Sequence, residues 1–204
     1  NARAILARRP DLFIEFQLYP LVNNIVAAEF GAAGIPVLAI DVPVPGSTYV
    51  GIDNYGTALL CGKTMARLIR ERWGGWERVD AVFLGQLPEA GDVTMLRSEG
   101  VANALAEEFG ASAADPKIIR FDFQSGADEE GGWGFREVLA AHPGPVRIAA
   151  AAINEIFMAG IISVLQGSGR WSADDTIIVT MGMDEIGQAQ LREGLSDAGV
   201  AFLP

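Results

Sequence analysis

The sequence predicts a parallel α/β fold in which buried strands alternate with helices. Apolar, β-branched runs alternate with helix-like segments of about a dozen residues, an order typical of a parallel sheet with crossover helices. Half of the 204 residues are hydrophobic and 20% are charged. That balance is ordinary for a globular protein, so the chain can bury a core.

The expected elements follow one another regularly along the chain. The strands are residues 11–16, 35–40, 49–52, 79–84, 117–123, 146–153, 176–181 and 200–202. The helices are residues 19–33, 54–73, 92–109, 128–141, 154–166 and 185–193. Asp53 has the side chain of a helix N-cap, and Gly74 and Gly75 are expected to end the helix that starts there.

The composition disfavours several classes of function. Acidic residues outnumber basic ones by 26 to 15, and the net charge of -11 repels nucleic-acid phosphates and anionic membranes. No apolar run reaches the ~18 residues that span a bilayer, because Asn154, Glu155 and Gly160 interrupt residues 148–165. The single cysteine, Cys61, excludes an internal disulfide and a multi-thiolate metal site. We therefore expect neither nucleic-acid binding nor membrane insertion.

Polar residues follow most of the expected strands. Ligands of open parallel sheets bind beyond the carboxyl ends of the strands. The residues at these ends are Glu15, Gln17, Asp41, Gln86, Gln124, Asn154 and Asp184. Amides and carboxylates in one crevice offer many hydrogen bonds and little reactive chemistry, which suits a neutral polyhydroxylated ligand. The alternative for Asn154 and Asp184 is that each only caps the helix that follows it.

Enzyme motifs do not fit the sequence. Residues 56–64, GTALLCGKT, are similar to a phosphate-binding loop, but five residues separate the glycines where that motif has four. Gly62 and Lys63 are therefore expected inside a helix. The only histidine, His142, lies in a turn-like His-Pro-Gly-Pro segment, which is typical neither of a catalytic triad nor of a histidine metal cluster. The sequence predicts no enzyme, no metal site and no cofactor.

Four short motifs occur in a characteristic order along the chain. They are residues 35–41 (IPVLAID) with 49–54 (YVGIDN), 97–100 (RSEG), 152–160 (AINEIFMAG) and 181–184 (MGMD). Together these motifs resemble the type I periplasmic sugar-binding proteins, the ribose-binding-protein-like solute-binding components of ABC transporters. The chain departs from that family at Glu155, where aspartate usually follows the asparagine, and at Phe202, which is glutamine in some relatives.

The resemblance implies two similar α/β lobes, with parallel sheets and flanking helices, that close on a hinge around a sugar. Residues 1–53 then correspond to part of the first lobe, 54–202 to nearly the whole second lobe, and 203–204 to the start of a return crossing. The chain begins with Asn1 and stops just after a strand-like segment. We therefore expect a truncated piece with an incomplete first lobe, in which five strands form most of the second lobe's sheet.

The resemblance also implies a set of ligand-binding residues. Asp41, Arg97, Asn154 and Asp184 are expected to hydrogen-bond sugar hydroxyls in one crevice, and Gln17 is a weaker candidate. Charged and amide groups suit neighbouring hydroxyls because each group can engage two of them at once.

The leading hypothesis is a non-enzymatic periplasmic protein that captures a sugar or similar polar solute and delivers it to the membrane permease of an ABC transporter. In a Gram-positive host such a protein is extracellular and membrane-associated. The alternative is the sugar-responsive effector domain of a lac-repressor-type transcription regulator, which shares this fold and crevice. A doubly wound enzyme is a third interpretation, for which the sequence shows no phosphate loop or catalytic base. An export signal upstream of the chain favours transport, and a helix-turn-helix favours regulation.

Overall fold

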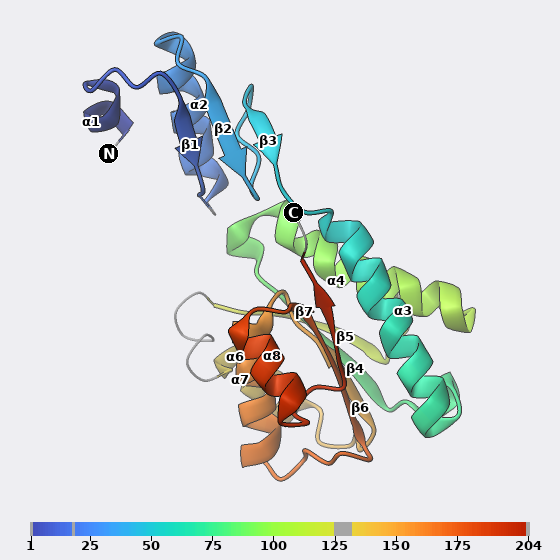
Figure 1. Ribbon diagram of the computed structural model, residues 1–204. Coiled ribbons are helices and arrows are strands. Elements are labelled where there is room, and N and C mark those ends of the chain that lie inside the picture. Colours follow the sequence, from blue (N-terminus) through green and yellow to red (C-terminus); the bar gives the residue numbers. More distant parts are fainter. Residues whose placement is uncertain (1, 18, 125–131, 203–204) are drawn as a thin grey trace. The chain divides into compact units, whose positions relative to one another are not determined.

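The computed structural model describes residues 2–17, 19–124 and 132–202 (Figure 1). These residues form two compact units, each with its own sheet and apolar core. The first unit contains the chain up to Ile52 together with Glu89–Val93, and the second contains Asp53–Pro88 and the residues from Thr94 onward. The assignment of residues 1–53 and 54–202 to two lobes of a larger protein stays a prediction.

The first unit contains a three-stranded parallel sheet with the order β1-β2-β3. Its elements are α1 (Ala2–Leu6), β1 (Phe13–Glu15), α2 (Pro20–Ala32), β2 (Val37–Ile40) and β3 (Thr48–Val50). Phe30 of α2 is fully buried and stacks on Phe13 of β1, with the ring centroids 4.2 Å apart. An ion pair of 2.9 Å between Arg3 and Glu29 connects α1 to α2. Burial in this unit is therefore concentrated between α2 and the sheet.

The second unit is built around a five-stranded parallel sheet with the order β5-β4-β6-β7-β8. Its strands are β4 (Ala81–Gln86), β5 (Ile118–Asp122), β6 (Ile148–Ala151), β7 (Thr176–Gly182) and β8 (Ala198–Ala201). The helices described after residue 53 are α3 (Asn54–Trp73), α4 (Asp92–Phe109), α6 (Trp133–Ala141), α7 (Glu155–Gly167) and α8 (Glu185–Arg192). Two short 3₁₀ turns, η1 (Trp76–Arg78) and η2 (Pro88–Ala90), flank β4. This architecture confirms the predicted α/β fold with parallel sheets and flanking helices.

Helices cover both faces of the five-stranded sheet, with α3 and α4 on one side and α6, α7 and α8 on the other (Figure 1). Parallel strands that are covered on both faces need apolar side chains in both directions, so they form continuous apolar runs. Every residue of β4 and of β6 is buried. The result is a well-packed sheet whose carboxyl-terminal edge carries polar residues.

Helix α3 begins and ends as the sequence indicates. The Asp53 carboxylate accepts a 2.8 Å hydrogen bond from the Gly56 N–H and so caps the helix. Gly74 has a left-handed backbone (φ 91°) at the C-cap, where its N–H donates to the Arg70 carbonyl oxygen over 3.1 Å. Both predicted ends of the helix are confirmed.

The GTALLCGKT segment lies within α3, so its likeness to a phosphate loop is incidental. Gly62 faces α4, where a Cβ would lie only 2.7 Å from the Val101 carbonyl oxygen. Gly100 of α4 is equally confined, because a Cβ there would lie 2.6 Å from the Cβ of Ala58 in α3. The two glycines allow the helix backbones to approach closely. The expected position of Gly62 and Lys63 inside a helix is confirmed.

The predicted elements agree with the observed ones in type and order, with differences at their ends. The helix expected at 92–109 has those bounds, whereas the strand expected at 146–153 is limited to Ile148–Ala151. The apolar run is longer than the strand, because Ala152 and Ile153 are buried but do not pair with a neighbouring strand. Helix α1 is not among the elements expected from the sequence. Residues 128–131 of the helix expected at 128–141 lie outside the described residues.

Candidate functional site

Polar residues of the second unit gather at the carboxyl-terminal edge of its sheet. Asn154 follows β6, Asp184 follows β7, and Arg97 reaches the end of β6 from α4. We call Arg97, Asn154 and Asp184 the strand-end cluster. Open parallel sheets bind their ligands at this edge, so the cluster is the candidate site of this unit.

Arg97 is the most extensively bonded member of the strand-end cluster. Its Nε donates a 2.7 Å hydrogen bond to Oδ1 of Asn54, and its Nη1 donates to the carbonyl oxygen of Ile153. The guanidinium lies over the ring of Phe202, with Cζ 4.6 Å from the ring centroid, an attractive cation–π arrangement. Asn54 is 5% exposed, so this charge-assisted bond is shielded from bulk water. Arg97 thus connects the start of α3 with the ends of β6 and β8.

Asn154 is the N-cap of α7. Its Oδ1 accepts a 3.1 Å hydrogen bond from the Phe157 N–H, and its backbone is extended. Arg97 binds the carbonyl oxygen of the preceding residue, Ile153, so the guanidinium lies at the backbone that leads into Asn154. The cap uses the side-chain oxygen, and a ligand hydroxyl as partner of Nδ2 stays a prediction.

Asp184 is the N-cap of α8, directly after β7. Its Oδ1 accepts a 3.0 Å hydrogen bond from the Gly187 N–H, and its side chain is exposed. Met183, the residue before it, has a left-handed backbone with φ 61°, which is uncommon outside glycine. Capping explains the observed hydrogen bond of Asp184, while its contact with a ligand stays a prediction.

Asp41 has a comparable backbone in the first unit, at the end of β2. It is also left-handed, with φ 60°. Its N–H donates to the Val50 carbonyl oxygen over 3.0 Å, and the Tyr49 hydroxyl donates to the Asp41 carbonyl oxygen over 3.2 Å. The backbone of Asp41 is therefore fixed by β3, and its half-buried side chain takes no part in these two bonds.

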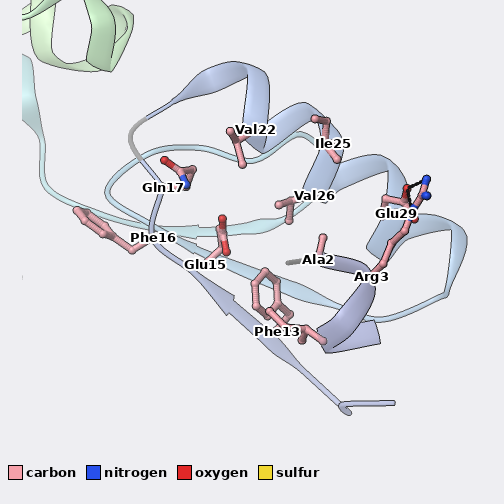
Figure 2. Close-up of a pocket in the computed structure, with 11 residues that line it drawn as sticks. Ala2, Arg3, Phe13, Glu15, Phe16, Gln17, Val22, Ile25, Val26 and Glu29 are labelled. Atoms are coloured by element: carbon pink, nitrogen blue, oxygen red, sulfur yellow. Dashed lines mark hydrogen bonds and ion pairs between the residues drawn. The ribbon is translucent and has the colours of Figure 1, made fainter. Parts of the chain in front are cut away.

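Gln17 lines a cavity of the first unit (Figure 2). The cavity has a volume of about 660 Å³ and lies against α1, β1 and α2. The Oε1 of Gln17 accepts a 3.1 Å hydrogen bond from the Tyr19 N–H. Glu15 lines the same cavity, and burial raises the pKa of its carboxyl. Asp41 is not among the lining residues, so the cavity does not unite the two candidates of this unit.

The sequence of the chain matches one protein family along nearly its whole length. The family described as periplasmic binding protein domain matches residues 2–204. The chain belongs to this family. No curated protein matches the chain. Membership of the periplasmic binding protein family and the fold expected from the four motifs are confirmed.

Solved structures similar to this periplasmic binding protein domain include two sugar-binding proteins. GanP, a glucose-galactose binding protein from Geobacillus stearothermophilus, is 20% identical with a TM-score of 0.72, and the match covers 95% of this chain and 64% of that chain. A sugar-binding protein of a sugar ABC transporter from Bacillus halodurans is 19% identical with a TM-score of 0.73, covering 97% and 64%. A LacI transcriptional regulator from Bacteroides fragilis is 14% identical with a TM-score of 0.66, covering 96% and 64%. The chain thus spans 64% of the length of these structures, and at such identities the likeness shows the fold alone.

The candidate site of this periplasmic binding protein domain includes residues that no sequence pattern assigns to it. The sequence indicates Asn54 as the start of a helix and part of a family motif, and it indicates Glu155 and Phe202 as departures from the family pattern, but it assigns none of the three to the site. Their contacts with Arg97 and with the end of β7 join segments far apart in the sequence. The one sequence signal that points to Glu155 is a charged residue within the apolar run 148–165. The structure buries this residue.

The predicted ligand residues fall into two groups. Arg97, Asn154 and Asp184 lie at one edge of the second unit, and Asp41 and Gln17 belong to the first unit. Their meeting in one crevice stays a prediction.

The described part of the chain offers hydrogen-bonding groups and little reactive chemistry. Cys61 is buried, and burial raises the pKa of its thiol to about 12. Nδ1 of His142 lies 2.8 Å from the Val138 carbonyl oxygen. Over residues 2–17, 19–124 and 132–202, no group of three or more His, Cys, Asp or Glu side chains is placed to hold a metal ion, and no helix is long and apolar enough to cross a membrane. The strand-end cluster combines a guanidinium, an amide and a carboxylate, which suits recognition of hydroxyl groups.

Proposed function

We propose that this chain is the greater part of a solute-binding protein that captures a sugar, or a similar small polyhydroxylated solute, for import by an ABC transporter. The observation that carries the proposal is the strand-end cluster in a member of the periplasmic binding protein family. Asp41 and, more weakly, Gln17 are proposed to contribute from the first unit.

The chemistry of the strand-end cluster explains why a sugar is the proposed ligand. Arg97 only donates hydrogen bonds, ionised Asp184 only accepts them, and the Asn154 amide does both. A hydroxyl both donates and accepts, so neighbouring hydroxyls can satisfy all three side chains. An apolar ligand would instead remove these groups from water without supplying partners, at a cost of about 1–3 kcal/mol for each unpaired group.

Thermal unfolding of the complete natural protein in the presence of single sugars tests the proposal. The panel is D-glucose and D-galactose together with D-allose and D-arabinose, which are bound in two further similar structures. A ligand at a hundredfold excess over its Kd stabilises the folded state by about 2.7 kcal/mol, so we expect at least one sugar to raise Tm clearly. Sucrose at equal osmolality is the control, because osmolytes stabilise proteins without a binding site. If no member of the panel exceeds sucrose, the proposed ligand class is wrong.

In this proposal the protein works outside the cytoplasmic membrane, with a membrane permease as its partner and without a cofactor or a catalytic step. The location is periplasmic, or extracellular and membrane-associated in a Gram-positive host. Fractionation of cells that express the complete natural protein tests this location, and recovery in the cytosol would contradict it. The net charge of -11 agrees with a protein that does not bind nucleic acid.

A second candidate function is the effector domain of a lac-repressor-type regulator, because a structure described as a LacI regulator shares this fold. A regulator requires a DNA-binding segment in addition to its sugar-binding part, whereas an exported binding protein requires a signal sequence. The gene sequence upstream of the codon for Asn1 distinguishes the two. A helix-turn-helix there would replace the transport proposal with the regulatory one.

A further inference from the structure

Glu155 is a buried acid that lies between two members of the strand-end cluster. It is the first residue of α7, directly after Asn154, and it is 2% exposed. Its side chain extends to the end of β7, where Oε1 accepts a hydrogen bond from the Met183 N–H. The N–H of Asp184 also acts on this carboxylate and favours its charged form. Glu155 therefore binds the backbone that leads into the Asp184 side chain.

The turn between β7 and α8 is shaped around the Glu155 carboxyl. A Cβ at Gly182 would collide with Oε2 of Glu155, and a Cβ at Gly187 would lie 2.5 Å from its Cγ. From α8, the Nε2 of Gln190 donates a 3.1 Å hydrogen bond to the Glu155 carbonyl oxygen. Gly182 and Gly187 thus leave room for the Glu155 side chain, and the Gln190 amide binds the Glu155 backbone. Glu155 is therefore packed against α8.

The hydrogen bond from Met183 stabilises an unfavourable backbone conformation. Met183 is left-handed, with φ 61°, and this region is disfavoured for residues other than glycine. A backbone N–H bound to a buried carboxylate makes a charge-assisted hydrogen bond, which is among the stronger kinds. Asp184 is the next residue, and its Oδ1 binds the Gly187 N–H over 3.0 Å. A fixed Met183 therefore fixes the point from which the Asp184 side chain extends.

We infer that Glu155 is a positioning residue for Asp184: its carboxylate fixes the turn between β7 and α8 and so sets where the Asp184 carboxylate lies. Because Glu155 is buried, it acts through the turn and does not contact the ligand. The inference rests on the proposed function only where it treats Asp184 as a ligand residue. The positioning itself requires no ligand.

The ionisation of Glu155 provides a way to observe this positioning. Burial is the largest effect on its carboxyl and raises the pKa, and the negative charge of Asp184 acts in the same direction. The backbone N–H groups of Glu155, Met183 and Asp184 lower the pKa, but the net shift is upward. A raised pKa in the folded state means that stability from this group is present at low pH and is lost as the pH rises through that pKa.

Uncharged groups of β7 and α8 also lie close to Glu155. They are Gly182 at the end of β7 and Gly187 in α8, and Gln190 of α8 binds the Glu155 backbone. Arg97 from α4 binds the Ile153 carbonyl oxygen, two residues earlier in the chain. Asp184 is the charged neighbour that acts on the ionisation of Glu155, so its removal should change that ionisation.

The test is a pH titration of backbone amide signals by NMR, on the whole chain and without ligand. In the unsubstituted protein we expect the Met183 and Gly187 amides to shift together at a pH above the ~4.3 of a free glutamate. In Glu155→Gln that step should be absent at both amides, because glutamine keeps the shape and does not ionise. Glu185→Gln is the matched control, since Glu185 is an exposed acid in the first turn of α8, and it should keep the step.

Each outcome of this titration decides the inference. It is wrong if the step persists in Glu155→Gln, or if Met183 shifts while Gly187 does not. If Glu155→Gln does not fold, Asp184→Asn replaces it, and loss of the neighbouring charge should move the midpoint at Met183 to lower pH. An unchanged midpoint would also overturn the inference. None of these readings depends on sugar binding, so failure of the proposed function is separately visible.

Discussion

Nε of Arg97 in α4 lies 2.7 Å from Oδ1 of Asn54, the buried first residue of α3. The same guanidinium donates to the Ile153 carbonyl oxygen and covers the ring of Phe202. One side chain thus joins the start of a helix to the ends of two strands. A residue with these contacts serves the fold and the candidate site together.

Replacing Arg97 with methionine should destabilise the second unit. Methionine retains an apolar stem but removes the charged donors to Asn54 and Ile153. Loss of such partners at buried acceptors costs about 1–3 kcal/mol, which urea unfolding measures as a lower midpoint at an unchanged m value. Arg67→Met is the matched control, because the exposed Arg67–Glu71 pair contributes about 0–1 kcal/mol. Equal losses in the two variants would contradict the role of Arg97.

Alanine at Gly62 should disrupt the packing of α3 on α4. The new Cβ would lie 2.7 Å from the Val101 carbonyl oxygen. Neither atom can move away unless its helix backbone moves with it. Overpacking of this kind costs about 1–3 kcal/mol of unfolding free energy. Gly167→Ala in α7 is the control, because a Cβ there meets nothing within 4 Å. A Gly62→Ala variant as stable as Gly167→Ala would show that the helices can separate without cost.

The Cys61 thiol should be unreactive in the folded protein. Its Sγ is buried 3.8 Å from the Val179 carbonyl oxygen, and burial raises the pKa of the thiol to about 12. Since the thiolate is the reactive form, almost none is present at neutral pH. We expect Ellman's reagent to label Cys61 fully in urea and hardly at all under native conditions. Rapid labelling of the folded protein would contradict the burial of Cys61 in α3.

The exposed apolar side chains of the first unit should cause self-association of this 204-residue chain. Ile14, Leu21 and Ile25 are each more than half exposed, and β1 is an edge strand among the described strands. Exposed edges and apolar patches promote pairing between chains. We expect the mass from light scattering to rise with concentration, and Leu21→Glu with Ile25→Glu to suppress the rise.

The control for self-association is Leu60→Glu, a similarly exposed leucine in α3 of the second unit. It should leave the concentration dependence unchanged. If the unsubstituted chain has the mass of a monomer over a wide concentration range, the exposed apolar side chains of the first unit do not cause self-association.

The sequence predicts the fold well because the deciding signals are local. The apolar run of β4 is a signature of a strand buried on both faces, and Asp53 and Gly74 mark the ends of α3 through their own capping chemistry. Asn154 and Asp184 are found at strand ends for the same reason. Each of these signals lies within a few residues of the feature that it predicts.

The contacts that complete the site depend on packing between distant segments. Arg97 and Asn54 are 43 residues apart and meet because Gly62 and Gly100 let α3 and α4 approach closely. Glu155 reaches Met183, 28 residues later in the chain, because β6 and β7 are neighbours in the sheet. Neither contact has a sequence pattern of its own, so only the fold reveals it.

The most direct test of ligand binding by the strand-end cluster is calorimetric titration of Asp184→Asn in the complete natural protein. The titrant is the sugar that raises Tm most, and Glu185→Gln serves as the control. Asparagine keeps an oxygen for the α8 cap, so the fold is retained while the charged acceptor is lost. We expect the affinity of Asp184→Asn to fall by about 1.5–3 kcal/mol, or about 10- to 150-fold, with Glu185→Gln unchanged. An unaltered affinity in Asp184→Asn would contradict the proposal and leave Asp184 as a helix cap alone.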